Sequence, residues 1–295
     1  MKISKVGSRL WELRLPEWKP KQMRALHLFF FFFAYQLQAQ FISGKVLDAA
    51  NGEPLPYVNI GVLNNNIGTV SDAYGNYYLE LQSKNLLDTL RFSMIGFGTK
   101  DLVVKDYLEQ EKEEMVILME EKSMKLAGVT LTRKKNQKYK RKILGNKTES
   151  KALVGGFTSN DLGNEIGFIC RIRKSPTFVE AFNISIAKNT YGLVRFRLNF
   201  YNLIEGMPHE NLLEEMIVVE TDIESGKVHV DLQSYDIVME DDFLVSIEWI
   251  EDLGIGELLF SAGFFGSNLY ARATSQGTWN QMGVAAFGMN VEVVY

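Results

Sequence analysis

The sequence predicts an all-β chain made of two antiparallel β-sandwiches, the second of them jelly-roll-like. Two observations lead to this fold class. Apolar side chains recur with a period of two along short segments, and clusters of Gly, Asn, Asp and Ser separate those segments. The length of 295 residues, 46% of them hydrophobic and 23% charged, suits one large domain or two small ones. We divide the chain into a leader (1–39), a first sandwich (40–120), a basic linker (121–154) and a second sandwich (155–295).

The leader has the pattern of a secretory signal peptide. A basic stretch (19–24) precedes an apolar run with five consecutive phenylalanines (29–33), and the small side chain of Ala39 suits cleavage by a signal peptidase. The run is about half as long as a membrane-spanning helix, and a buried helix or a short membrane anchor is the alternative. No cysteine stands directly after the apolar run, where a lipid-anchored protein would need one, so we expect a mature chain without a lipid anchor. Translation from Met1 and from Met23 both fit this pattern.

The segment 40–120 alternates as half-buried strands do. A first strand at 42–47 leads to an Asn51-Gly52 pair, which adopts a positive φ at little cost. Asp72 and Asn76 bracket another tight turn, and two side-chain oxygens are too few for a calcium site. Further strands are expected at 57–62, 77–81, 90–94, 103–104 and 115–118.

Several ordered motifs of this segment resemble a known family. They are Ser43-Gly44-Lys45-Val46, the run from Asn51 to Ile60, Gly68 to Asp72, and Gly75-Asn76-Tyr77. They are similar to the carboxypeptidase-regulatory-like domain, which is found in secreted proteins and at the start of many TonB-dependent outer-membrane receptors. The resemblance covers about eighty residues and implies a transthyretin-like, or Ig-like, sandwich of seven strands. It also implies an accessory module without peptidase activity.

The residues agree that the chain is not a zinc carboxypeptidase. His209 and His229 are the histidines of the mature chain, and neither begins a His-x-x-Glu motif. The single cysteine, Cys170, excludes an intramolecular disulfide. We therefore expect no metal ion and no cofactor.

The segment 121–154 is strongly basic. Residues 121–151 hold eleven Lys or Arg against two acids, a net charge of +9. A solvated linker is the simplest interpretation, and an electrostatic contact with an anionic outer-membrane surface or with the acidic second sandwich is the more specific one. Nucleic acid is not an expected partner, because stacking aromatic residues do not accompany the charges. Within it, 126–132 resembles the short strand that joins the accessory domain to a receptor plug.

Strong alternation resumes after residue 155 and predicts about eight strands. This number suits a jelly-roll-like sandwich. An eight-stranded outer-membrane barrel is the alternative, and the aromatic Tyr295 after alternating Val291 and Val293 favours it. The continuous apolar run 217–219 disfavours it, because such a run breaks the alternation of a barrel strand.

One cluster in the second sandwich suggests ligand binding. Glycines and aromatic residues alternate from 260 to 270, and Tyr270, Arg272 and Trp279 could form a platform for a sugar or a peptide. Core packing explains the same residues. Adjacent carboxylates, as at 240–242, point to opposite faces of a strand, so we nominate no catalytic residue.

These observations predict a non-enzymatic binding or scaffold protein that is exported to the Gram-negative cell envelope. We expect a glycan or an envelope protein as its partner, in the periplasm, at the outer membrane or outside the cell. The alternatives are a small outer-membrane barrel with an accessory domain and a hydrolase with an unrecognised site. The formal charge of −4 becomes −9 without the leader, and −18 once the linker is also set aside.

Overall fold

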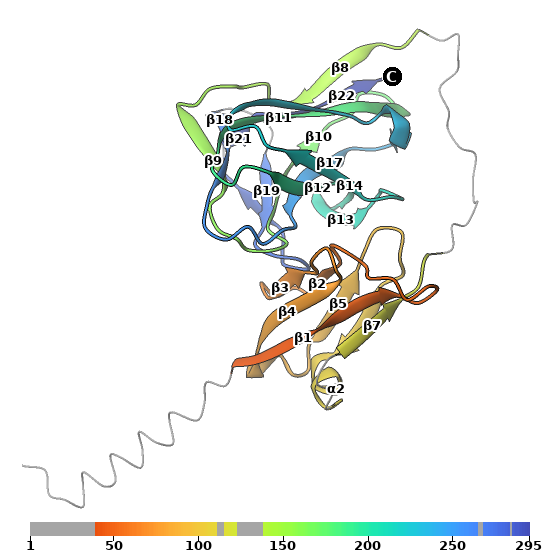
Figure 1. Ribbon diagram of the computed structural model, residues 1–295. Coiled ribbons are helices and arrows are strands. Elements are labelled where there is room, and N and C mark those ends of the chain that lie inside the picture. Colours follow the sequence, from red (N-terminus) through yellow and green to blue (C-terminus); the bar gives the residue numbers. More distant parts are fainter. Residues whose placement is uncertain (1–38, 111–114, 123–137, 265–267, 284) are drawn as a thin grey trace, which may run out of the picture. The chain divides into compact units, whose positions relative to one another are not determined.

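The computed structural model describes residues 39–110, 115–122, 138–264, 268–283 and 285–295 (Figure 1). The predicted signal peptide and the segment 123–137 of the predicted linker lie outside these residues. Residues 40–295 form one compact unit. The described part of the chain contains no helix with the length and hydrophobicity that a membrane span requires.

The first sandwich has the seven strands that the family resemblance implied. One sheet has the order β4-β1-β7 and the other the order β3-β2-β5-β6. The strands are β1 (Ala39–Asp48), β2 (Asn59–Val62), β3 (Gly68–Val70), β4 (Asn76–Gln82), β5 (Thr89–Ser93), β6 (Lys100–Val103) and β7 (Met115–Met119). A short 3-10 helix, η2 (Ser83–Asn85), and the helix α2 (Val104–Leu108) complete it.

Alternation in the sequence places one side chain of every two in the core of the first sandwich. In β4, Tyr77, Leu79 and Leu81 are buried, and the residues between them are exposed. The turn before β4 is held by Asp72, whose Oδ1 accepts the backbone N–H groups of Tyr74 and Asn76. The predicted strand at 103–104 ends at Val103, because Val104 begins α2.

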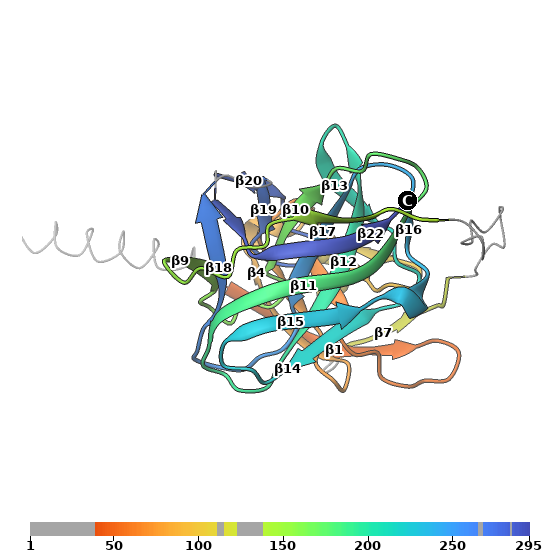
Figure 2. The same ribbon diagram turned by 90° about the horizontal axis from the view of Figure 1, so that it is seen from above.

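The second sandwich consists of two antiparallel sheets, which we name after their central strands. The β17 sheet has the order β13-β12-β17-β10-β19-β20, and β14 also pairs with β12. The β11 sheet has the order β21-β18-β11-β22-β8, with β9 paired to β18 and with β15 and β16 paired to β11. Figure 2 shows β22, β11 and β15 running side by side.

The second sandwich has fifteen strands in the part of the chain that is described, more than the eight expected. The long strands β11 and β12 each pair with several short ones, which the sequence pattern does not separate. The strands are β8 (Arg141–Gly145), β9 (Leu153–Phe157), β10 (Glu165–Cys170), β11 (Thr177–Asn189), β12 (Val194–Ile204), β13 (Met207–Asn211), β14 (Ile217–Thr221), β15 (Gly226–Asp231), β16 (Val238–Met239), β17 (Phe243–Trp249), β18 (Leu258–Phe264), β19 (Leu269–Arg272), β20 (Asn280–Met282), β21 (Ala285–Phe287) and β22 (Met289–Val294). A 3-10 helix, η3 (Gln233–Tyr235), precedes β16.

One strand, β8, lies inside the segment that the sequence assigned to the linker (121–154), and β9 begins in its last two residues. Strand β8 pairs with β22, and its Leu144 belongs to the core of the second sandwich. Strand β9 pairs with β18 and buries Phe157. The lysines around Leu144 hide this short apolar signal in the sequence, so the second sandwich begins earlier than residue 155.

The core of the second sandwich lies between the inner faces of its two sheets. Phe196, Trp249 and Ile247 point inward from the β17 sheet, and Phe182 and Val291 point inward from the β11 sheet. All five are fully buried. Burial of such large apolar side chains supplies much of the free energy of folding in a domain without disulfides.

We predict that Phe196→Ala lowers the free energy of unfolding by about 3–5 kcal/mol, because it leaves a cavity at a fully buried position. Urea unfolding followed by intrinsic fluorescence measures this change. The control is Leu193→Ala at a side chain that is 45% exposed, with an expected change below about 0.5 kcal/mol. Equal losses in the two variants would contradict the assigned core.

Candidate functional site

A row of four charged side chains crosses the outer face of the β17 sheet, which is the face turned away from the core. Arg197 on β12 stands opposite Glu248 on β17, Glu248 opposite Glu165 on β10, and Glu165 opposite Arg272 on β19. We call these four residues the charge row. Each is flanked along its strand by residues that pack into the core, so the strand period of two brings all four to the outer face.

The charge row is almost completely buried. Both carboxylates are 0% exposed, Arg197 is 1% exposed and Arg272 is 9% exposed. Removing ionised groups from water costs several kcal/mol per ion, and only close pairing with further hydrogen bonds offsets this cost. The row is therefore stable only if nearly every polar atom in it finds a partner.

Hydrogen bonds connect the row from one end to the other. Nε and Nη2 of Arg197 donate to Glu248 Oε2 at 2.9 and 2.8 Å. Nδ2 of Asn199 donates to both carboxylates, at 2.8 Å to Glu248 Oε2 and 2.9 Å to Glu165 Oε1. Nε of Arg272 donates to Glu165 Oε2 at 2.7 Å. The bridging amide lets the two carboxylates lie next to each other with fewer uncompensated contacts.

The structure brings the three predicted binding residues together at the Arg272 end of the row. The guanidinium carbon of Arg272 lies 5.0 Å from the ring centroid of Trp279 and 5.8 Å from that of Tyr201. Tyr270 packs with Tyr201 and Leu244 in a small apolar cluster, to which Trp279 adds its half-buried ring.

The predicted platform is occupied by the chain's own side chains. Tyr270 is 5% exposed, and Arg272 holds Glu165 while its Nη2 donates to Tyr201 Oη at 3.1 Å. A sugar ring could stack on Tyr270 or Arg272 only if these contacts broke. Among the three residues, the ring of Trp279 retains the most exposed surface.

Burial and pairing shift the acid-base behaviour of this region. Burial raises the pKa of Glu165, and the Arg272 guanidinium opposes that shift. Burial also raises the pKa of the Tyr201 hydroxyl well above its ordinary value. Burial acts to lower the pKa of Arg272, but Glu165, Tyr201 and Glu248 together outweigh it and the pKa is raised. Arg272 and the Tyr201 hydroxyl therefore keep their protons at neutral pH.

The other end of the charge row contacts the first sandwich. Nη1 of Arg197 donates to the backbone oxygen of Tyr57 at 2.6 Å, and Nη2 donates to Asn59 Oδ1. Tyr57 has a φ of 59°, a left-handed conformation that is uncommon for a residue with a side chain. Its hydroxyl donates to Glu251 Oε1 at 3.0 Å, and burial, followed by this contact, raises the pKa of Tyr57 to about 12.

The loop after β19 also contacts the first sandwich. Nε2 of Gln276 donates to Ser93 Oγ at 2.7 Å, and the backbone N–H of Asn64 donates to the backbone oxygen of Gln276 at 3.2 Å. A Cβ atom at Gly61 or at Gly68 would lie 2.4 Å from the Ser275 oxygen. Glycine at both positions therefore lets the backbones of β2 and β3 come close to this loop.

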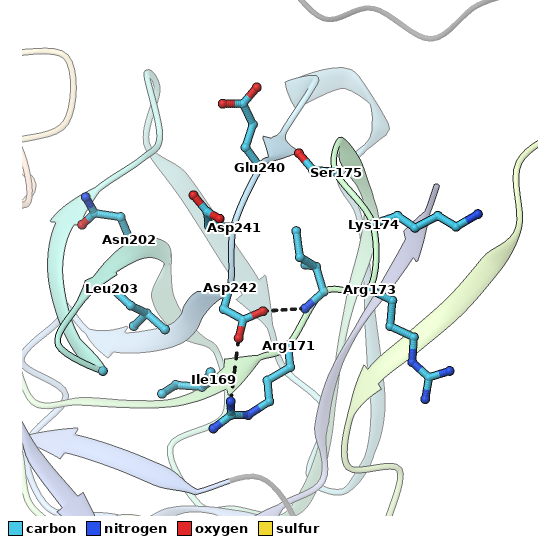
Figure 3. A pocket seen from close by; sticks show the side chains of 12 residues that line it. Ile169, Arg171, Arg173, Lys174, Ser175, Asn202, Leu203, Glu240, Asp241 and Asp242 are labelled. Atoms are coloured by element: carbon cyan, nitrogen blue, oxygen red, sulfur yellow. Dashed lines mark hydrogen bonds and ion pairs between the residues drawn. The ribbon is translucent and has the colours of Figure 1, made fainter.

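A pocket of about 760 Å³ opens at one end of the second sandwich (Figure 3). One wall is the β12–β13 hairpin with Asn202 and Leu203, and another is the turn before β17 with exposed Glu240 and Asp241. The loop between β10 and β11 supplies the remaining wall.

Asp242 ties the floor of this pocket together. Its Oδ1 accepts the Ile172 N–H at 2.8 Å, and its Oδ2 lies 3.9 Å from Arg171 Nη1. Figure 3 shows Asp241 beside this floor, facing the hairpin that carries Asn202 and Leu203. The pocket thus offers carboxylates, the cationic side chains of Arg171, Arg173 and Lys174, an amide and aliphatic side chains, and none of the described residues that line it is aromatic.

Sequence reasoning missed Glu165, Arg197 and Glu248. Their alternation with apolar residues indicated an outer face, which the sequence interprets as solvated. The available signal was a charged residue next to large apolar ones in each of three strands, EIGFIC, VRFRLNFYNLI and FLVSIEW. The second signal was Tyr201, an aromatic side chain on the same face as Arg197 and Asn199.

The described residues contain no group of three or more His, Cys, Asp or Glu placed to hold a metal ion. Cys170 is free and buried, and burial raises the pKa of its thiol well above the ordinary value. A thiol with a raised pKa is a poor nucleophile at neutral pH.

We predict that Arg197→Met lowers the free energy of unfolding by about 3–5 kcal/mol, because it leaves the Glu248 carboxylate buried without its main partner. The matched control is Arg91→Met, which breaks the exposed Arg91–Asp101 pair and should cost less than about 1 kcal/mol. Urea unfolding measures both. Equal costs would show that the charge row is not a structural centre.

Comparison with known proteins relates the first sandwich to one protein family and to one receptor. Residues 42–131 match the family described as the CarboxypepD_reg-like domain. TonB-dependent receptor P3 of Formosa agariphila is 34% identical over 90 residues, which are 28% of this chain and 9% of the receptor. This chain therefore aligns with less than a tenth of the receptor's length.

A solved structure, that of the infectious bursal disease virus Gx strain, matches 87% of this chain and 63% of its own at 8% identity and a TM-score of 0.23. A TM-score this low does not indicate a shared fold. The family match agrees with the motifs, the seven strands and the two-sheet arrangement of residues 39–119. The first sandwich of this chain is a carboxypeptidase-regulatory-like domain.

Proposed function

We propose that the protein is an exported, non-catalytic binding protein of the Gram-negative cell envelope, and that its pocket holds a segment of another protein. The family match and the TonB-dependent receptor relative support an envelope location. The predicted signal pattern of the leader agrees with export.

The lining of the pocket is the observation that carries the choice of a protein ligand. Glu240 and Asp241 offer exposed carboxylates, and Leu203 and Ile169 offer aliphatic surface. The same lining also holds three cationic side chains, those of Arg171, Arg173 and Lys174. A polypeptide combines cationic, amide and apolar groups, so it can satisfy such a lining. Sugars are commonly bound by stacking on aromatic rings, and the described lining residues supply none.

The state of the buried carboxylates supports a non-catalytic role. Glu165 and Glu248 lie side by side as an acid-base pair would, yet both are 0% exposed and engaged with Arg, Asn and Ser side chains. A general acid or base must reach the reacting group within hydrogen-bond distance. A substrate reaches neither carboxylate in this arrangement.

We predict that the purified protein binds members of a peptide array that carry a basic residue beside an apolar one, and that Asp241→Lys weakens this binding at least about tenfold. Asp222→Lys is the control, because Asp222 is equally exposed, lies in the turn between β14 and β15, and gives the same change in net charge. Fluorescence anisotropy of labelled array hits measures the affinities.

Two results would contradict the proposal. Equal weakening by Asp241→Lys and Asp222→Lys would mean that net charge, and not the pocket, controls binding. Binding to a glycan array in place of the peptide array, unaffected by Asp241→Lys, would indicate a sugar ligand at another surface.

A further inference from the structure

Four cationic side chains lie along one rim of the second sandwich, beside β8. They are Lys140 and Lys142 from the β8 segment and Arg173 and Lys174 from the loop between β10 and β11, and we call them the rim cations. Tyr295 connects the two groups. The backbone oxygen of Tyr295 accepts the backbone N–H of Lys140 at 2.9 Å, and the centroid of the Tyr295 ring lies 5.7 Å from Lys174 Nζ.

The pairing of β8 explains why its lysines are on the rim. Lys142 and Leu144 share a face and stand opposite Val293 and Val291, whose side chains lie in the core. A Cβ atom at Gly145 would lie 2.6 Å from the ring of Phe168, so the end of β8 lies against β10. Because β8 is the last strand of its sheet, the lysine stem can cover the edge of the core while the ammonium group reaches water.

The loop between β10 and β11 brings two more cations to the same rim. Arg173 and Lys174 line the pocket from this loop, and Figure 3 shows them on the side of the loop where the yellow-green β8 runs. Both side chains are exposed. Residues about thirty positions apart in the sequence therefore present positive charge on one edge of the sandwich.

The neighbouring acids do not neutralise the rim cations. Glu180 is paired with Arg141 at 2.7 Å, and Asp242 is the partner of Arg171. Among the described residues, no ion pair involves the four rim cations. They form a positive edge on a mature chain whose net charge from the sequence is −9.

We infer that the rim cations bind phosphate groups of an anionic lipid surface. Arg173 and Lys174 border the pocket, whereas Lys140 and Lys142 are not among its lining residues, so the four cations together suit an extended array of phosphates better than a single small anion. Juxtaposed Lys and Arg near an anionic bilayer each contribute measurably to binding, and the attraction falls off within a Debye length. The inference rests on the proposed envelope location and adds the surface that would meet the membrane.

Co-sedimentation of the purified protein with vesicles tests this surface directly. We expect binding to vesicles of phosphatidylcholine with one third phosphatidylglycerol, little binding to phosphatidylcholine alone, and loss of binding as the salt concentration rises. The double variant Lys140→Glu/Lys174→Glu should lower the partition coefficient at least about tenfold. The neutral variant Lys140→Gln/Lys174→Gln should lower it by a smaller factor.

The matched control is Lys100→Glu/Lys227→Glu, which makes the same change in net charge at exposed positions on β6 and β15. Circular dichroism establishes that each variant is folded. Equal losses in the test and control variants, or no preference for the anionic vesicles, would overturn the inference. Competition by millimolar inorganic phosphate, or binding to duplex DNA without binding to vesicles, would overturn it as well. The peptide assay of the pocket uses no lipid, so failure here leaves the proposed pocket ligand standing.

Discussion

The buried charge row is the constraint on which the rest of the structure depends. Two Arg and two Glu side chains on four neighbouring strands are compensated only in one register, because each must stand opposite its partner. A slip of one residue would turn Arg197 and Glu248 into the apolar core, and the cost of that exceeds the stability of a typical domain. The row therefore fixes the pairing of β12, β17, β10 and β19 more strictly than apolar alternation alone.

The same row connects the two sandwiches. The Arg197 guanidinium has five N–H donors, and Glu248 accepts from only two of its nitrogens. The Tyr57 oxygen and Asn59 Oδ1 of the first sandwich accept from the remaining side of the guanidinium. Without the first sandwich, a buried cation would lose part of its hydrogen bonding, so the carboxypeptidase-regulatory-like domain completes the second sandwich in addition to folding as its own β-unit.

Period-two alternation made the first sandwich predictable almost strand by strand, because each strand has one buried and one solvated face. The same rule misplaced the start of the second sandwich, since β8 offers only Ile143 and Leu144 among lysines. The sequence also grouped Tyr270, Arg272 and Trp279 as a binding platform. It did not show that the Arg272 guanidinium already donates hydrogen bonds to Glu165 and Tyr201. A sequence pattern assigns a side chain to a face of a sheet, but what covers that face depends on contacts between residues far apart in the chain.

The charge row also determines where recognition is left to occur. It buries Glu165, Glu248, Arg197 and Arg272 against one another, so a ligand does not reach these groups in this arrangement. Exposed charges of both signs meet at one end of the second sandwich, where two of the rim cations, Arg173 and Lys174, line the same pocket as Glu240 and Asp241. One end of the sandwich can therefore present the carboxylates of Glu240 and Asp241 to a basic segment, while Lys140 and Lys142 continue the positive charge of the loop along its edge. Net charge alone, which is −4 for the whole sequence, hides this division.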